Sequence, residues 1–463
     1  MKINVVKKRA SKPTMAFLGL MLFVLMIIMV GQNQLFFLSR LHSFVNSTPR
    51  TISHNHGGSS VQKSKAIISC DRSHYFYDIC SINGSTIFDP FESTFYDMDT
   101  TNKNGTNFIL EKIRPYPRKW ENFTMGRIKE ITLTTGPLGP TCLIQHKAQA
   151  LVFSVGGYTG NFFHDINDGF LPLFITVNSL FPNQDFIFVI SKLEDWWVQK
   201  YKDLLQSFSK HPIINLDKEN VTHCFPKATF GLMSHGFMTI DQNLTPTSKT
   251  LIDFHKFLAT TYGADRKSVR TLSQFQSRPR PRPRPRLVLA SRNESVGRLI
   301  LNQNEVKLVA EQIGFEVILL EPRKNTSLHE SFGLIHSSHA MIGVHGAALT
   351  HALFLRPGSI FIQIIPIGAE GVSDLCFGKI ARDMKLVYEE YKIGIEESSL
   401  VAKFAKEDSL VLKNPKALQE KGWSKEIMDI YLREQNIKLD LNRFRIYLEI
   451  AYKKAKAFMA VNG

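Results

Sequence analysis

Residues 345–348 combine a histidine with a small-residue turn at a place where a strand should end. They follow the apolar run Ala340–Val344, and a second apolar run after them ends at Pro357 and Gly358. A buried strand that leads through such a turn into a helix presents free backbone N–H groups and a partial positive charge. The pattern therefore predicts a phosphate-binding turn at a sheet edge where ligands bind. A capping or core role for His345 is the alternative.

A second polar group follows the glycine-rich turn 156–161. Its members recur at i, i+3, i+4 and i+7 and would share one face of a helix: Asn161, His164, Asp165 and Asp168. One histidine and two carboxylates at the mouth of a strand–helix unit are residue types that transfer protons. A solvated helix face is the alternative interpretation.

Strands and helices alternate around both groups. The expected strands are 150–155, 185–190, 212–216, 287–290, 316–320, 340–344, 359–366 and 385–393. The expected helices are 195–209, 303–313, 328–337, 347–355 and 376–383. This alternation predicts doubly wound sheets. Arg292, at the end of its strand, should face the same edge as His345, and its planar guanidinium suits a diphosphate. We expect a last amphipathic helix, 441–458, to cross back to the first domain.

The 463 residues, 43% of them hydrophobic, suit two domains. Much of the formal charge of +16 lies in two segments that are not expected to fold, the N-terminal residues 1–14 and the Arg-Pro tract 278–286. We therefore expect no nucleic-acid partner. The tract itself should be an extended interdomain linker, 277–286.

The N-terminal segment predicts a membrane anchor. An apolar stretch at 15–37 follows the basic tail 1–14, so the rule that positive residues stay inside keeps the tail cytoplasmic. Residues 38–66 are polar and suit a stem, and the body would lie in the lumen. A cleaved signal peptide is the alternative.

Glycosylation sequons and few cysteines agree with a lumenal body. The sequons expected to carry glycans are Asn46, Asn83, Asn104, Asn122 and Asn220. In an oxidising lumen we expect two disulfides and one free buried thiol: Cys70–Cys80, Cys142–Cys224 and Cys376. The cysteines lack zinc-finger spacing. An Asp-x-Asp pair at Asp97 and Asp99 lacks a clear preceding strand, so we expect no metal there.

Six segments together resemble glycosyltransferase family 61, most of all its plant xylan branch of arabinosyl- and xylosyltransferases. They are 70–80, 152–168, 223–236, 287–302, 342–358 and 396–400. The resemblance implies an inverting, type II Golgi membrane enzyme that uses a UDP-sugar. It also implies a GT-B fold, in which two Rossmann-like domains face a cleft. Relatives usually have the sequence Ser-Arg-Lys-Gly at this position. This chain has Ser291-Arg292-Asn293-Glu294 instead, so a carboxylate replaces a cation near the expected nucleotide.

On this resemblance we expect an acceptor and base domain at 67–276 and a UDP-sugar domain at 287–440, followed by the helix segment 441–463. The expected nucleotide-sugar residues are Ser291, Arg292, His345, Gly346, Ala347 and Ala348. The expected acceptor-side residues are Gly157, Tyr158 and Asn161. Asp168 should be the base, oriented by His164, with Asp165 as second choice.

The expected reaction moves xylose or arabinofuranose from a UDP-sugar to a xylan-type polysaccharide in the Golgi, without a metal or other cofactor. A β-1,2-xylosyltransferase of N-glycan cores and a non-catalytic Golgi scaffold are the alternatives. A Golgi enzyme complex and a homodimer are the alternatives for assembly.

Overall fold

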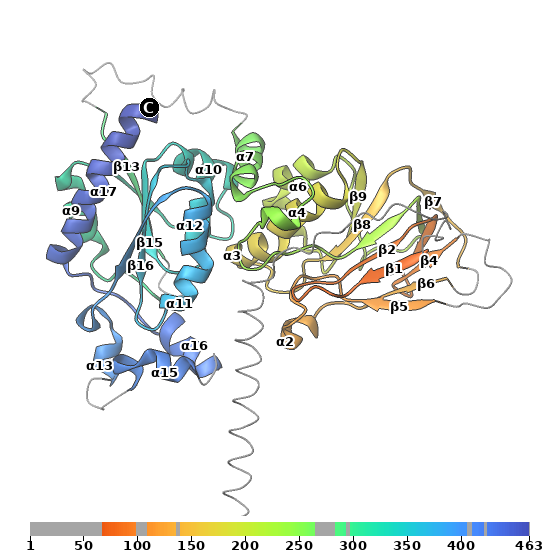
Figure 1. Cartoon of the computed structure of the whole chain (residues 1–463), viewed down its shortest axis with the longest axis horizontal. Coiled ribbons are helices and arrows are strands. Elements are labelled where there is room, and N and C mark those ends of the chain that lie inside the picture. Colours follow the sequence, from red (N-terminus) through yellow and green to blue (C-terminus); the bar gives the residue numbers. More distant parts are fainter. Residues whose placement is uncertain are drawn as a thin grey trace, which may run out of the picture. The chain divides into compact units, whose positions relative to one another are not determined.

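The computed structural model describes residues 67–98, 109–135, 139–263, 283–292, 297–404, 410–420 and 424–462. All of them belong to one compact unit, Lys65–Gly463. They form a mixed α/β body with three sheets (Figure 1). The predicted tail, anchor and stem, and the Arg-Pro tract up to residue 282, lie outside the described residues. None of the helices in the described ranges is long and apolar enough to cross a membrane.

The second half of the chain forms a five-stranded sheet, called here the parallel sheet. Its order is β14 (Glu316–Leu320), β13 (Arg286–Ala290), β15 (Ala340–Val344), β16 (Ile360–Ile365) and β17 (Val387–Lys392), and all neighbours are parallel. The chain leaves β13 toward one edge and returns to the other side of β13 as β15. The carboxyl ends of β13 and β15 therefore meet where the strand order reverses, which is where sheets of this order bind ligands.

Helices cover both faces of the parallel sheet (Figure 1). Alternate strand residues point to opposite faces. Leu289 and Ile342 therefore pack with α9 (Gln303–Ile313) and α17 (Leu441–Asn462), whereas Val288 and Met341 pack with α10 (Leu328–His336) and α12 (Lys379–Asp383).

Two predictions about this half are wrong. Helix α17 does not cross back to the first half, because its stripe of Phe444, Leu448 and Ala451 packs into the core of the parallel sheet beside α9. The ring of Tyr452 also contacts Phe315 at 5.2 Å between centroids. In addition, β13 already begins at Arg286, so the end of the predicted linker belongs to the sheet.

The first half has a six-stranded sheet, called here the mixed sheet. Its order is β1 (Ile68–Asp71), β2 (Ile79–Ile82), β12 (Ala228–Phe230), β8 (Gln149–Ser154), β9 (Phe186–Ser191) and β10 (Ile214–Asn215). The last four strands are mutually parallel. Helices α4 (Leu171–Leu180), α5 (Asp195–Lys200) and α6 (Lys202–Phe208) lie against one face.

A second six-stranded sheet, the outer sheet, lies against the other face of the mixed sheet. Its order is β5 (Leu110–Ile113), β6 (Ile131–Thr134), β4 (Thr94–Asp97), β3 (Thr86–Asp89), β11 (His223–Phe225) and β7 (Ile144–Gln145). The ring of Phe95 on β4 lies 4.8 Å from that of Phe230 on β12, and both sheets share one buried core. The predicted doubly wound first domain is therefore correct on the helical face only, since a sheet replaces the second helix layer.

Helix α7 (Leu251–Tyr262) joins the two halves. Phe254 packs on Phe174 of α4 at 5.3 Å, whereas Tyr262 packs on Phe332 of α10 at 5.9 Å. The His255 ring nitrogen Nδ1 donates to the carbonyl of Leu353 across the same contact, at 2.8 Å. The cores of the two halves are therefore continuous through α7.

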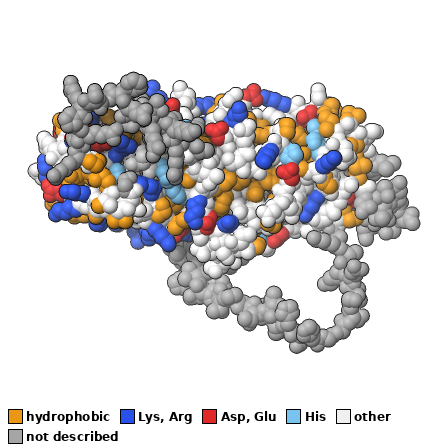
Figure 2. Space-filling view, turned by 90° about the horizontal axis from the view of Figure 1, so that it is seen from above, with side chains coloured by type: hydrophobic (Ala, Val, Ile, Leu, Met, Phe, Trp, Pro, Cys, Tyr) orange, Lys and Arg blue, Asp and Glu red, His pale blue; other side chains and the backbone are white. Residues whose placement is uncertain are grey.

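The covalent links are those that the sequence analysis expected. Cys70 is joined to Cys80 and Cys142 to Cys224, and Cys376 is buried and unpaired. Among the sequons, Asn122 and Asn220 are exposed and Asn83 is half-buried, while Asn46 and Asn104 lie outside the described residues. Basic and acidic side chains are interspersed with apolar ones over the face shown in Figure 2.

Candidate active site

Two arginines meet at the carboxyl ends of β13 and β15. Arg292 Nη2 and Arg298 Nη1 both donate to the backbone carbonyl of His345, at 3.1 and 3.0 Å. Gly346 follows with a φ of +143°, and a Cβ atom there would lie 1.6 Å from Arg292 Nη2. Only glycine therefore lets the guanidinium rest on this turn.

The two guanidinium groups share one site, and no counterion for them stands among the residues that the structure describes. Burial lowers the pKa of Arg292 to about 10, and burial together with the charge of Arg292 lowers the pKa of Arg298 to about 9. Within the described ranges, neither forms an ion pair with a carboxylate. Two neighbouring, partly desolvated cations are unfavourable until an anion joins them. The arrangement, called here the anion site, therefore suits an anion, and its two guanidinium forks suit a diphosphate.

Sequence reasoning found Arg292 but missed Arg298. Arg298 does not stand at the end of a strand, and its backbone has a positive φ of 56° directly after Gly297. A second arginine six residues after the first was the sole available signal. Ser291, which was predicted to bind the nucleotide, ends the strand, and its N–H donates to the carbonyl of Leu320 at 2.8 Å.

His345 is held neutral beside the arginines. Burial and the charges of Arg298 and Arg292 keep the pKa of His345 well below its usual value. Gln363 Oε1 accepts from the hydroxyl of Tyr388 at 2.6 Å, so its amide Nε2 must donate to His345 Nδ1, at 3.1 Å. The ring proton of His345 therefore sits on Nε2.

The segment after Gly346 is a 3₁₀ helix, η5 (Ala347–Phe354), and not the α-helix that was predicted. The backbone hydrogen bonds of a 3₁₀ helix have poorer geometry than those of an α-helix. Here the ring of His351 adds a hydrogen bond, because its Nδ1 donates to the carbonyl of Ala348 at 2.9 Å. Ala347 and Ala348 nevertheless stand at the helix start beside Gly346, as expected. The arginines therefore contribute more charge at this turn than the short helix does.

A histidine–aspartate pair lies in the first half. His164 ends α3 (Phe162–His164), and Asp168 lies in the π-helical turn η2 (Asp165–Phe170) that follows. His164 Nδ1 lies 2.8 Å from Asp168 Oδ2. Arg118 Nη2 lies 3.1 Å from the same nitrogen, but a carboxylate only accepts, so Nδ1 must carry its proton toward Asp168. Nε2 of neutral His164 is then unprotonated and able to accept a proton.

Asp168 does not suit the role of base that the sequence analysis gave it. Its side chain is 2% exposed and accepts hydrogen bonds from Tyr116 Oη, Arg118 Nε, His164 Nδ1 and Asn167 Nδ2. Burial alone would raise the pKa of Asp168, but donation by His164 and the charge of Arg118 outweigh burial and lower it. His164, 19% exposed, is the more accessible member of the pair, and the buried Asp168 orients its ring.

Asp165 has a structural role. It accepts from Tyr201 Oη at 2.7 Å, from Trp197 Nε1 at 3.2 Å and from the N–H of Gly160 at 3.3 Å. Burial raises the pKa of Asp165 despite these bonds. Asp165 therefore anchors the glycine-rich turn to α5 and is not directed toward His164.

The predicted acceptor-side residues surround the pair. Tyr158 stacks on the His164 ring with centroids 4.3 Å apart, and Asn161 caps α3 by accepting from the N–H of Phe163. A Cβ on Gly157 would lie 2.3 Å from Tyr116 Oη, so this glycine lets Tyr116 reach Asp168. Tyr116 and Arg118 were not predicted, because they come from a loop between two strands of the outer sheet that carries no recognisable motif.

Phe377, in η6 (Asp374–Gly378), connects the two groups. Its ring centroid lies 5.4 Å from that of His345 and 5.7 Å from that of Phe163, the neighbour of His164. The ring of Phe162 also stacks near that of His351, at 4.4 Å. Phe377 therefore links the neighbourhood of the two arginines, at His345, with that of the histidine–aspartate pair, at Phe163.

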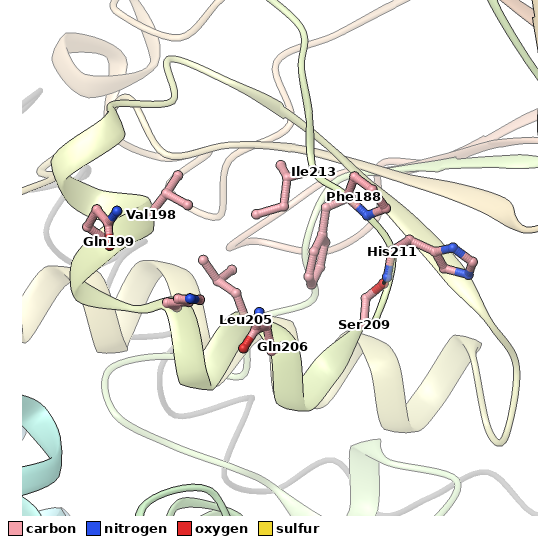
Figure 3. A pocket seen from close by; sticks show the side chains of 10 residues that line it. Phe188, Val198, Gln199, Leu205, Gln206, Ser209, His211 and Ile213 are labelled. Carbon is pink, nitrogen blue, oxygen red and sulfur yellow. Dashed lines mark hydrogen bonds between the residues drawn. The ribbon is translucent and has the colours of Figure 1, made fainter.

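Neither of two pockets elsewhere combines such groups. One, of about 280 Å³, lies between β9 and α6 and is lined by Phe188, Leu205, Ser209 and His211 (Figure 3). The other, of about 600 Å³, lies between Trp196 and Lys200 on α5 and the loop 324–329. The described ranges also contain no group of three side chains suited to a metal ion.

Comparison with known proteins identifies the family. The model of the family Glycosyltransferase 61 matches residues 160–362, which include both groups. Xylan glycosyltransferase MUCI21 of Arabidopsis thaliana is 38% identical over 401 residues, which cover 84% of this chain and 80% of the relative. The chain belongs to glycosyltransferase family 61. It is therefore a glycosyltransferase, as the resemblance implied.

Two further relatives are similar over most of this chain. Alpha-1,3-arabinosyltransferase XAT2 of Oryza sativa subsp. japonica is 34% identical, covering 82% of this chain and 64% of its own. Beta-1,2-xylosyltransferase XYXT1 of the same organism is 34% identical, covering 72% and 70%. The solved structure of the heptosyltransferase TibC aligns with a TM-score of 0.27 at 13% identity, over 55% of this chain and 67% of its own, and this likeness is too low to carry an argument.

Proposed function

We propose that this family 61 enzyme transfers xylose or arabinofuranose from a UDP-sugar to a xylan-type polysaccharide, with inversion at the sugar. The relatives are named as xylan, arabinosyl and xylosyl transferases, which supports a pentose donor and a xylan acceptor. We also propose a GT-B arrangement, in which the half with the parallel sheet holds UDP. In this proposal the chain is a type II Golgi membrane protein, anchored through 15–37 with its body in the lumen.

One arrangement carries the proposal: Asp168 orients His164, and two arginines without a carboxylate partner among the described residues meet at the His345 carbonyl. The ring of Phe377 lies against both His345 and Phe163, the neighbour of His164. An inverting transfer needs one base on the side of the sugar opposite to the leaving group. The acceptor hydroxyl attacks the anomeric carbon, its proton passes to His164 Nε2, and the bond from that carbon to UDP breaks. UDP leaves with the negative charge, which Arg292 and Arg298 stabilise.

Each half of the site has a distinct energetic task. A well-placed base contributes about 10²–10⁴-fold to the rate. Each charge contact to the leaving group contributes about 2–4 kcal/mol, because charge grows on it in the transition state. Since the two arginines offset the diphosphate charge, we propose that neither a divalent metal nor another cofactor is required. Activity that persists in excess chelator would support this part of the proposal.

The decisive experiment uses the full-length chain purified in detergent. UDP-xylose and UDP-arabinofuranose are each supplied with xylo-oligosaccharides or with an N-glycan core, and the product anomer is determined by NMR. We expect one UDP-pentose to be transferred to xylo-oligosaccharides with inversion. Transfer to the N-glycan core alone would replace xylan as the acceptor, and tight UDP binding without any transfer would indicate a scaffold. Protease protection of intact Golgi vesicles tests the orientation.

A further inference from the structure

A continuous surface of aromatic side chains leads away from His164. It is defined by Tyr75, Trp120, Phe123, Arg127 and Tyr158 and is called here the aromatic surface. Tyr75 stacks on Trp120 at 5.8 Å between centroids. Arg127 lies over the rings of both Phe123 and Tyr158, at 4.9 and 5.2 Å. The guanidinium of Arg118 lies over both Trp120 and Tyr158 and links the two ends.

The aromatic surface begins at the catalytic histidine. The ring of Tyr158 stacks directly on His164, and its hydroxyl donates to Glu121 Oε1 at 2.7 Å. Glu121 also accepts from Arg118, the guanidinium that binds Asp168. The position of Tyr158 is therefore fixed by the same network that orients His164. A molecule that lies on this surface has one end at the base.

Parts of the surface are unusually open to solvent. The side chain of Phe123 is 74% exposed and that of Tyr75 is 50% exposed. Arg127 is exposed too, and no carboxylate among the described residues forms an ion pair with it. Single exposed apolar side chains are common, but a connected group beside a catalytic residue indicates a binding surface. Flat aromatic rings pack well against the C–H faces of sugar rings, with polar edges left to the hydroxyl groups.

We propose that the aromatic surface holds the acceptor, as an extended chain of pyranose sugars whose reacting unit lies at His164. This inference rests on the proposed function and adds where the acceptor chain lies beyond its reacting sugar. The test separates this occupant from two others: the glycan expected on Asn122, which is the chain neighbour of Phe123, and an acceptor bound in the pocket beside Trp196.

Phe123→Ala tests the inference, with Phe91→Ala as a matched control. Phe91 is 77% exposed in the turn between β3 and β4 of the outer sheet, and among the described residues it forms no ring contact with the aromatic surface. In Phe123→Ala we expect KM for long xylo-oligosaccharides to rise about 5-fold or more, because one stacking platform is lost. The value of kcat, the affinity for UDP and KM for the shortest acceptor should not change. Phe91→Ala should behave as the unmodified chain.

Three outcomes would overturn the inference. Equal effects of Phe123→Ala and Phe91→Ala would show that the surface has no special role. A rise in KM with Trp196→Ala, but not with Phe123→Ala, would place the acceptor in the other pocket. A fall in KM with Asn122→Gln would show that the protein's own glycan covers Phe123.

Failure of the proposed function gives a different result. If no pentose is transferred to xylo-oligosaccharides, the reaction assignment fails whatever the variants do. Calorimetric binding of xylohexaose in the presence of UDP then still tests the surface. Binding that weakens in Phe123→Ala, but not in Phe91→Ala, would support it without any turnover.

Discussion

Replacing Arg298 by Met should stabilise the ligand-free protein and at the same time abolish tight UDP binding. Arg298 donates a hydrogen bond to the carbonyl of His345, and its positive charge is repelled by that of Arg292. In the described ranges no carboxylate balances the charge of Arg298. Replacement of a residue that stabilises the fold lowers the free energy of unfolding. Replacement of a residue that serves to bind an anion should raise the free energy of unfolding of the ligand-free protein, because burial of its charge is unfavourable until the anion binds.

The magnitude follows from the pKa of Arg298, which is lowered from 12.5 to about 9. That difference corresponds to about 5 kcal/mol. Because the residue is only half-buried and solvent screens it, we expect about 1–2 kcal/mol of stabilisation from Arg298→Met. The folded state disfavours the cation, so this penalty is complete below pH 9 and is lost as the pH rises further. The gain in Tm should accordingly be smaller at pH 10 than at pH 7.

The assay compares thermal unfolding with UDP calorimetry. In the unmodified chain, UDP at about 100 times its Kd should add about 2.7 kcal/mol of stability. Arg298→Met should show a higher Tm without UDP, little further rise with UDP, and a loss of about 2–4 kcal/mol in transition-state stabilisation. Arg323→Met, at a 67% exposed arginine paired with Glu321, should leave UDP binding unchanged. A lower Tm with UDP binding intact would refute the anion-site argument.

Two substitutions and one labelling experiment test the rest of the site and its surroundings. Asp168→Asn should keep UDP binding but lower turnover about 10²-fold or more, because it removes the group that orients His164; circular dichroism must show an intact fold, and full activity would contradict the assigned role. Gly346→Ala should weaken UDP binding at least about 10-fold, because the added Cβ displaces Arg292, and calorimetry would reveal an unchanged affinity if that reasoning is wrong. The Cys376 thiol, whose pKa burial raises to about 12, should be alkylated only after denaturation, and labelling of the native protein seen by mass spectrometry would contradict its burial.

The parallel sheet is predictable from the sequence because its strands are apolar runs bounded by turns. The predicted strand 340–344 coincides with β15, and the predicted strand 287–290 matches β13 except that β13 begins one residue earlier, at Arg286. The same runs locate Arg292 and His345, since parallel strands end at one edge. The family resemblance then connects this edge with a nucleotide-sugar.

The outer sheet and half of the catalytic network could not be predicted in this way. Strands β3 to β6 have four residues each, and β3 pairs with β11, more than a hundred residues later in the chain. The spacing of His164 and Asp168 shows that they share a face, but it cannot show which of them faces outward. That depends on donors such as Arg118, which comes from 50 residues earlier and donates to Asp168 together with Tyr116 and Asn167.

Because His345 keeps one fixed protonation state, the two halves of the site should differ in how their kinetic constants depend on pH. Its pKa lies well below 6.5, and those of Arg292 and Arg298 lie at about 10 and 9, so none of the three changes charge near neutrality. The donor half should then present the same hydrogen bonds and charges throughout that range. The KM for the UDP-sugar should be flat in a pH–rate profile. Any acidic limb in kcat therefore reports on the half that contains His164.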